Sequence, residues 1–329
     1  MVPQGKATYE KQSMKRIGNL YEQITSMSNL MEADKKAQRG KSNHYGVVLH
    51  NSNKEGNLLM LQDMLASKTY RTSVYDIFKI YEPKERVVYR LPYFPDRIAH
   101  HAIMNVLENV FVKTFTEDTY SCIKKRGIHH LLYKLKTDLR DIHGTQYCLK
   151  FDIKKFYPSI DHDVLKALLR RKFKDQDLLC LLDEIVDSAP GLPIGNYLSQ
   201  YLANFYLSYF DHWIKEQKQV KYYYRYADDV VILDSDKNRL HALLASIKEY
   251  LASLKLEVKG THQVFPVDAR GIDFVGYVFR HTHIGIRKEI KKNFARKLSR
   301  NPAHVSKHSY LGWFKHCDAK HLTKKLIPQ

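Results

Sequence analysis

The stretch from Tyr222 to Leu233 constrains the fold more than any other part of this sequence. Aromatic and β-branched residues at its two ends favour a pair of short strands. Where those strands would turn, the sequence places two adjacent acids, Asp228 and Asp229, in place of the Asn-Gly or Asp-Gly of an ordinary hairpin. Two neighbouring carboxylates repel each other, so a bound divalent cation would explain why both are present.

A further acid stands at the end of another predicted strand. The largely apolar run Tyr147–Phe151 ends on Asp152 and passes into a turn before Pro158. Two-metal phosphoryl or nucleotidyl transfer needs ions about 3.5–4 Å apart that a few carboxylates hold. We therefore expect Asp152 to lie beside the acids of the predicted hairpin and to share two cations with them.

Three motifs, in this order, resemble the palm of reverse transcriptases: Phe151-Asp152, Leu192-Pro-Ile-Gly195 and Tyr226-Ala-Asp-Asp229. The resemblance covers about residues 75–325. It implies an α+β fold shaped like a right hand, with fingers, a palm of antiparallel sheet plus helices, and a short helical thumb. It also implies an RNA-directed DNA polymerase that uses deoxynucleoside triphosphates and two Mg²⁺ ions, with Mn²⁺ as an alternative.

The resemblance assigns the catalytic and metal-binding roles to the acids. Asp152 and Asp228 would be the main metal ligands, and Asp229 would be a second acid with a weaker direct role. Ile153 would offer its main-chain carbonyl to a metal. This assignment requires that residues far apart in the sequence meet in space.

The resemblance also suggests residues that hold the incoming nucleotide. Lys84 and Arg86 lie near the tip of a strand pair predicted over Val74–Arg90, where cations would grip the triphosphate; the alternative is an ordinary charged turn. Tyr157 occupies the place where the family keeps a ring under the sugar, which excludes a 2′-hydroxyl; the alternative is a core side chain. Lys259 lies near the position of a proton-donating lysine.

Most reverse transcriptases carry Gln where this chain has Ile194. The pattern Ile194-Gly195-x-x-x-Ser199-Gln200 resembles that of diversity-generating retroelement enzymes. Gln can hydrogen-bond near the nascent base pair and Ile cannot. The resemblance therefore implies a nucleotide site that includes Ile194, Gly195 and Gln200, and cDNA with frequent errors opposite adenine. The implied partners are a structured template RNA, the RNA–cDNA duplex, dNTPs and a small helical accessory protein of the accessory variability determinant type.

Three segments are expected along the chain. Apolar residues spaced by three and four over Ile17–Lys36 and near Glu55–Ser67 predict helices in an N-terminal extension, residues 1–73. The fingers and palm would occupy residues 74–280, and a basic helical thumb would occupy residues 281–329.

The charge of the chain indicates a polyanionic partner. Lys and Arg number 54 against 35 Asp and Glu, which gives a formal net charge of +19. Neutralised phosphates release counterions, which favours nucleic acid; an anionic membrane surface is the other interpretation. A basic helix predicted over Arg287–Arg300 would follow the template–primer backbone. Because no run of about 18 apolar residues occurs, we expect no membrane span and a cytoplasmic location in a bacterial cell or in the host of a phage.

Two other functions stay open on the sequence alone. One is a group II-like or retron-like reverse transcriptase in anti-phage defence, which the neighbouring genes would distinguish. The other is a non-catalytic RNA-binding protein built on a palm fold. The acids at all three positions of the motifs argue against the second.

Overall fold

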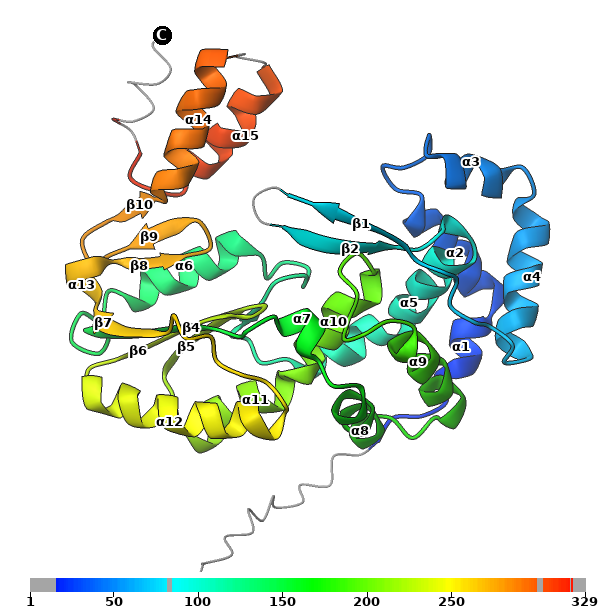
Figure 1. The fold of residues 1–329 in the computed structure, drawn as a ribbon, viewed down its shortest axis with the longest axis horizontal. Helices are drawn as coiled ribbons and strands as arrows, with labels where there is room; N and C mark the ends of the chain where they lie inside the picture. The colour runs from blue at the N-terminus through cyan, green and yellow to red at the C-terminus, as the bar shows by residue number, and fades with distance from the viewer. Residues whose placement is uncertain (1–15, 82–84, 301–303, 320, 322–329) are drawn as a thin grey trace, which may run out of the picture. The chain divides into compact units, whose positions relative to one another are not determined.

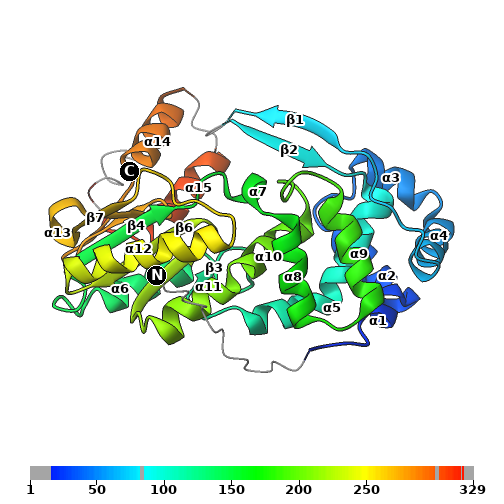
Figure 2. The ribbon, with the colours of Figure 1, turned by 60° about the horizontal axis from the view of Figure 1, so that its bottom comes forward.

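The computed structural model describes residues 16–81, 85–300, 304–319 and 321. Its ribbon is shown in Figure 1 and from a second direction in Figure 2. The chain divides into two compact units. The first unit comprises the chain up to Glu108 together with Asp161–Ser199, and the second comprises Asn109–Ile160 together with the chain from Gln200 onward.

Helices make up most of the first unit. The helix predicted over Ile17–Lys36 is broken in two, because Ser26 adopts an extended backbone with a ψ of 138°. The helix predicted near Glu55–Ser67 is confirmed. The helical elements are α1 (Tyr21–Thr25), α2 (Met27–Ala37), α3 (Tyr45–Asn51), α4 (Lys54–Ala66), η1 (Tyr93–Arg97), α5 (Ile98–Thr114, which continues into the second unit), α8 (His162–Lys172) and α9 (Gln176–Asp187).

The buried carboxylate of Asp34 ties the N-terminal helices together. Tyr93 donates its hydroxyl to Asp34 Oδ1 at 2.5 Å, and Lys54 Nζ lies 2.6 Å from Oδ2. His50 Nε2 lies 3.2 Å from Oδ1. A buried charge is tolerated only when it is paired and hydrogen-bonded, so these contacts join α2, α3, α4 and η1 at one point.

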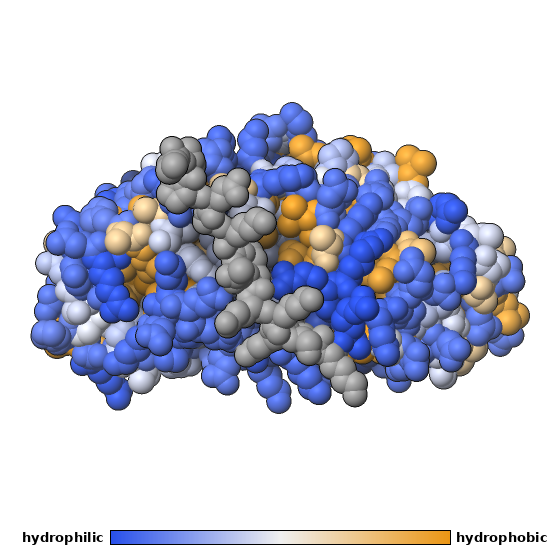
Figure 3. All heavy atoms as spheres, turned by 90° about the horizontal axis from the view of Figure 1, so that it is seen from below, coloured by the Kyte–Doolittle hydropathy of each residue, from blue (hydrophilic) through white to orange (hydrophobic). Residues whose placement is uncertain are grey.

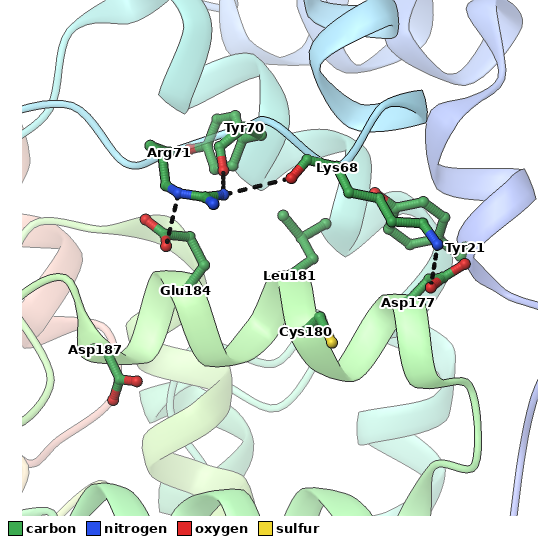
Figure 4. A pocket seen from close by; sticks show the side chains of 9 residues that line it. All are labelled: Tyr21, Lys68, Tyr70, Arg71, Asp177, Cys180, Leu181, Glu184 and Asp187. Atoms are coloured by element: carbon green, nitrogen blue, oxygen red, sulfur yellow. Dashed lines mark hydrogen bonds and ion pairs between the residues drawn. The ribbon is translucent and has the colours of Figure 1, made fainter.

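The segment that follows α4 lies against α9 through ion pairs (Figure 4). Lys68 Nζ is 2.7 Å from Asp177 Oδ1, and Arg71 Nε is 3.8 Å from Glu184 Oε2. These pairs border a cavity of about 300 Å³ that α1 and α9 also line. The cavity lies where the residues that follow α4 pack against α9. Lys68, Arg71 and their acidic partners along its border are already paired with one another.

A pair of strands lies between α4 and η1 in the first unit. Strands β1 (Asp76–Ile80) and β2 (Arg86–Arg90) are antiparallel and largely exposed, which confirms the pair predicted from the sequence. Arg86 is the first residue of β2 and pairs with Ile80. Lys84 lies outside the described residues.

A five-stranded sheet forms the centre of the second unit, with the strand order β3-β5-β6-β4-β7. Its neighbouring strands are antiparallel except for β3 and β5, which are parallel. The strands are β3 (Thr119–Tyr120), β4 (Tyr147–Asp152), β5 (Tyr222–Tyr226), β6 (Asp229–Asp234) and β7 (Gln263–Pro266).

Helices cover both faces of this sheet. Successive strand residues point to opposite faces, and Cys148, Val231 and Leu233 share a core with Leu131 and Leu135 of α6 (Ile128–Asp138). On the other face α12 (Lys237–Ser253) lies along β4, β6 and β7 (Figure 1). The second unit also contains α7 (Phe156–Ser159), α10 (Tyr197–Tyr206, which begins in the first unit), α11 (Ser208–His212), η2 (Trp213–Gln217) and α13 (Val267–Arg270).

A small antiparallel sheet and two helices complete the second unit. The sheet has the order β10-β9-β8, and a Cβ on Gly276, whose φ is +92°, would lie 2.5 Å from the Trp313 ring, so the turn between β8 and β9 needs glycine. Helix α14 confirms the basic helix predicted over Arg287–Arg300. The elements are β8 (Ile272–Phe274), β9 (Tyr277–Phe279), β10 (Ile284–Ile286), α14 (Lys288–Arg300) and α15 (His304–Phe314).

The surface is mostly polar where it is seen in Figure 3, and its hydrophobic side chains gather in a few separate areas. Within the ranges that the structure describes, no helix combines the length and the apolar composition that crossing a bilayer requires.

Candidate active site

The hairpin predicted around Asp228 and Asp229 is present in the second unit. Strands β5 and β6 pair so that Tyr226 stands opposite Asp229, which leaves a two-residue turn of Ala227 and Asp228. Ala227 has a φ of +55°, a left-handed conformation that a non-glycine residue adopts at a cost. The turn therefore places two carboxylates at one end of the sheet.

Strand β4 brings the third acid to the same end. It pairs with β6 along its whole length, and in this register Asp152 stands directly opposite Asp229. Opposed residues on antiparallel strands have Cα atoms about 4.5–5.5 Å apart. The structure thus brings together Asp152, Asp228 and Asp229, as expected.

At this end of the sheet, three carboxyl groups lie close together. Burial raises the pKa of the Asp229 carboxyl to about 7; the carboxylates of Asp152 and Asp228 push in the same direction, while Lys150 and Arg287 oppose them. Lys150 Nζ lies 3.8 Å from Asp229 Oδ2. Asp229 Oδ1 is buried and has no hydrogen-bond partner among the described residues.

These observations fit a cation held by the acids. Like charges at close range and an oxygen without a donor are both relieved when a divalent ion binds. Within the described part of the chain, no group of three or more His, Cys, Asp or Glu side chains is arranged as a ready-made metal site. The fit therefore rests on the electrostatics of Asp152, Asp228 and Asp229 and on the orphan oxygen of Asp229.

Three other predicted residues lie around the acids. The amide of Ile153 donates to the carbonyl of Asp228 at 3.2 Å, and the amide of Lys259 donates to the carbonyl of Asp152 at 2.8 Å. Tyr157, on α7, is half-buried, and burial raises its pKa, with Cys122 and Asp228 adding to the shift. The Lys259 side chain is exposed.

The remaining predicted nucleotide residues are divided between the two units. In the first unit Tyr89 on β2 donates its amide to the carbonyl of Ile194 at 2.9 Å. Gly195 has a φ of +124°, and a Cβ there would lie 2.5 Å from the carbonyl oxygen of Tyr89. The glycine is thus required for the close approach of this loop to β2, the strand that begins with Arg86. Gln200 is exposed on α10 in the second unit.

A basic groove on the small sheet was not predicted from the sequence. It is a hollow of about 540 Å³. A cross-strand row of Asp273, Val278 and Gly285 lines it, together with the basic side chains of Arg270, Arg280, Lys288 and Lys291 and the imidazole of His283. Arg287 pairs with Asp273 at 2.6 Å, so the acid in this row is neutralised. Lys288 and Lys291 belong to the basic helix that was predicted, but the groove as a whole could not be predicted, because its other residues meet only through the register of three short strands.

The raised pKa of Asp229 predicts how the metal-free protein responds to pH. The folded protein binds this proton more tightly than the unfolded chain, whose Asp titrates near 3.8, so the contribution to stability is present at low pH and is lost as the pH rises through about 7. We expect the free energy of unfolding in EDTA to fall by roughly 2–3 kcal/mol from this group between pH 5 and pH 8. Urea unfolding of the parent and of Asp229→Asn checks this. An Asp229→Asn variant with the pH slope of the parent would contradict it.

Comparison with known proteins gives a consistent family assignment. The sequence profile described as reverse transcriptase (RNA-dependent DNA polymerase) matches residues 82–279. Protein YkfC of Escherichia coli (strain K12) is 23% identical over 300 residues, which cover 74% of this chain and 78% of YkfC. The group II intron-encoded protein LtrA of Lactococcus lactis subsp. cremoris is 27% identical over 139 residues, which cover 39% of this chain and only 23% of LtrA.

A solved structure with the same architecture is that of apo telomerase from Candida tropicalis. It superposes with a TM-score of 0.50 at 13% identity and covers 70% of this chain and 52% of the telomerase chain. At this identity the likeness concerns the fold alone. Together with the profile match, it confirms the right-hand α+β fold expected from the three motifs.

Proposed function

This chain belongs to the reverse transcriptase family of RNA-dependent DNA polymerases, and from that premise we propose that it copies a structured template RNA into cDNA by two-metal nucleotidyl transfer. One observation carries the proposal: Asp152 stands opposite Asp229 in the sheet, with Asp228 in the adjoining turn.

Asp152 and Asp228 are the proposed ligands of two Mg²⁺ ions, with the carbonyl of Ile153 as a further ligand. When bound, such ions activate the attacking 3′-hydroxyl and stabilise the charge on the departing pyrophosphate. Asp229 contributes negative potential that draws cations to this end of the sheet. Lys150, beside Asp229, limits the repulsion among the acids in the metal-free protein.

A primer-extension assay tests the proposed reaction. Purified protein is given an RNA template with an annealed DNA primer, all four dNTPs and Mg²⁺ or Mn²⁺. The expected product is a longer strand that DNase degrades and RNase does not. Absence of extension with either metal, on templates that a known reverse transcriptase copies, would overturn the proposal.

We place the enzyme among those that copy RNA with low accuracy opposite adenine, as in a diversity-generating retroelement. Ile194 supports this proposal, because an apolar side chain cannot offer the hydrogen bonds that Gln offers near the nascent base pair. A small helical accessory protein is part of the same proposal. The similarity to LtrA favours a second candidate, an enzyme of the group II intron type, which would copy adenine as accurately as the other bases.

Ile194→Gln is expected to improve base selection opposite template adenine. One regained hydrogen bond is worth about 1 kcal/mol, which corresponds to a roughly fivefold lower misincorporation rate. Sequencing of cDNA from an adenine-containing template measures this rate. Ile194→Val, which remains apolar, is the matched control and should keep the error rate of the parent. An unchanged rate in Ile194→Gln would contradict the role of this residue.

The basic groove is proposed to hold the backbone of the template–primer duplex. Lys288→Glu combined with Lys291→Glu should weaken duplex binding and make it less salt-dependent, because each lost phosphate contact lowers the salt slope by about one. Fluorescence anisotropy of a labelled RNA–DNA duplex at several salt concentrations measures both. The matched control is Lys237→Glu with Lys248→Glu on α12, and equal slopes in the two double variants would rule out the groove as the contact.

A further inference from the structure

A buried arginine lies directly behind the turn that carries Asp228. Arg225 is on β5, two residues before Ala227, and its side chain has no exposed surface. Its guanidinium makes five hydrogen bonds, which use all the donors that an arginine side chain has. Two of them go to Asp211, two go to Asn204, and one goes to the carbonyl of Ala227.

The partners of the guanidinium hold it in one orientation. Asp211 receives Nε at 2.7 Å and Nη2 at 2.5 Å, a two-point contact that fixes the plane of the group. Asp211 is also fully buried, and it accepts the hydroxyls of Tyr223 at 2.6 Å and Thr119 at 2.9 Å. Asn204 receives Nη1 at 3.0 Å. The guanidinium therefore cannot rotate without breaking several buried hydrogen bonds.

The fifth hydrogen bond acts on the backbone of the turn. Nη1 donates to the carbonyl oxygen of Ala227 at 3.0 Å. That carbonyl belongs to the peptide group between Ala227 and Asp228, so fixing it fixes the plane from which the side chain of Asp228 departs. The same bond holds Ala227 in its left-handed conformation, which the turn requires and the residue alone disfavours.

We propose that Arg225 is a positioning residue: held by Asp211 and Asn204, its guanidinium grips the Ala227 carbonyl and so sets the direction of the Asp228 carboxylate. This inference rests on the proposed function of Asp228. Stability alone does not account for the arrangement, because a buried ion pair loses hydration that apolar side chains of similar size would not lose. The bond to Ala227 is also unnecessary for pairing with Asp211.

Two variants separate positioning from a purely structural role. Arg225→Lys keeps the charge opposite Asp211 but lacks the planar fork that reaches Asp211, Asn204 and Ala227 together. Tyr223→Phe removes the hydrogen bond that the Tyr223 hydroxyl donates to Asp211 Oδ1, the oxygen that also accepts from Arg225 Nε. This substitution leaves the turn itself unchanged. Both are assayed by steady-state primer extension at a temperature where thermal unfolding shows each protein to be folded.

The expected result is a split between the two variants. Arg225→Lys should lower kcat by roughly 100-fold, the size of effect that a small misplacement of a reacting group produces, while KM for the dNTP changes little. Tyr223→Phe should keep the kcat of the parent within about twofold. Hydrogen exchange of the peptide 222–233 should be faster in Arg225→Lys only. A kcat for Arg225→Lys close to that of the parent, or equal losses in both variants, would overturn the proposal.

A second variant tests the proposal if Arg225→Lys does not fold. The pair Arg225→Gln with Asp211→Asn then replaces it, since two amides can still bond to each other but the shorter Gln cannot reach Ala227. A parental kcat in this double variant would overturn the proposal, and a large loss with unchanged KM would support it. If the parent protein itself fails to extend primers, the proposed function fails. Hydrogen exchange of the peptide 222–233 in parent and variants still tests whether Arg225 fixes the turn.

Discussion

Replacing Asp228 with asparagine is expected to lower the rate of primer extension by roughly 10³-fold or more, because preorganised charge at the reacting centre is the largest contribution in such sites. Asn has nearly the same volume as Asp, so the two-residue turn and the register of β5 with β6 should remain. What is lost is one negative charge at the place where the proposed metal ions would meet the departing pyrophosphate. Single-turnover extension at saturating dNTP and Mg²⁺ measures the loss.

The control for this experiment lies on the same strand. Asp234 stands at the opposite end of β6, where it pairs with Tyr147 in the sheet, so Asp234→Asn changes the same chemical group away from the other acids. It should extend primers as the parent does. Extension by Asp228→Asn at the rate of the control would mean that the catalytic carboxylates lie elsewhere in the protein.

Tyr157→Ala is expected to relax the choice between deoxyribonucleotides and ribonucleotides. A ring under the sugar leaves no room for a 2′-hydroxyl, and removing it opens that space, so the ratio of ribonucleotide to deoxyribonucleotide incorporation should rise by roughly 100-fold. Because the ratio is taken within one protein, it is insensitive to any general loss of activity from the cavity that the variant leaves.

The matched variant for the sugar experiment is Tyr157→Phe, which keeps the ring and removes the hydroxyl. It should retain the discrimination of the parent, since the ring provides the obstruction. Competing dCTP and CTP on the same primed RNA give the ratio directly. Discrimination that survives in Tyr157→Ala would return this residue to the alternative of an ordinary packing side chain.

The three acids could be predicted from the sequence because each lies where a run of strand-forming residues passes into a predicted turn. Aromatic residues precede Asp228 and Asp229 and β-branched residues follow them, and a largely apolar run ends at Asp152. The predicted meeting of these acids is a matter of register, and β4 pairs with β6 in the register that brings Asp152 opposite Asp229. The need of two-metal transfer for several carboxylates, together with the family resemblance, supplied that expectation, since local propensity alone does not choose between strands.

Other features were beyond the sequence for a physical reason. Nothing near Arg225 marks it as buried, because its partner Asp211 lies in a helix that precedes β5 and their contact depends on tertiary packing. The basic groove likewise exists only after β8, β9 and β10 pair. The break at Ser26 was missed because the apolar spacing continues through it.

The tether between β2 and the loop at Ile194 has an evolutionary consequence. It consists of main-chain groups, the amide of Tyr89 and the carbonyl of Ile194, with Gly195 providing the clearance. This hydrogen bond joins main-chain groups, so it does not depend on which side chain is present at position 194. If Ile194 sets copying accuracy as proposed, a substitution at this one position would change that accuracy while the scaffold around the loop stays the same.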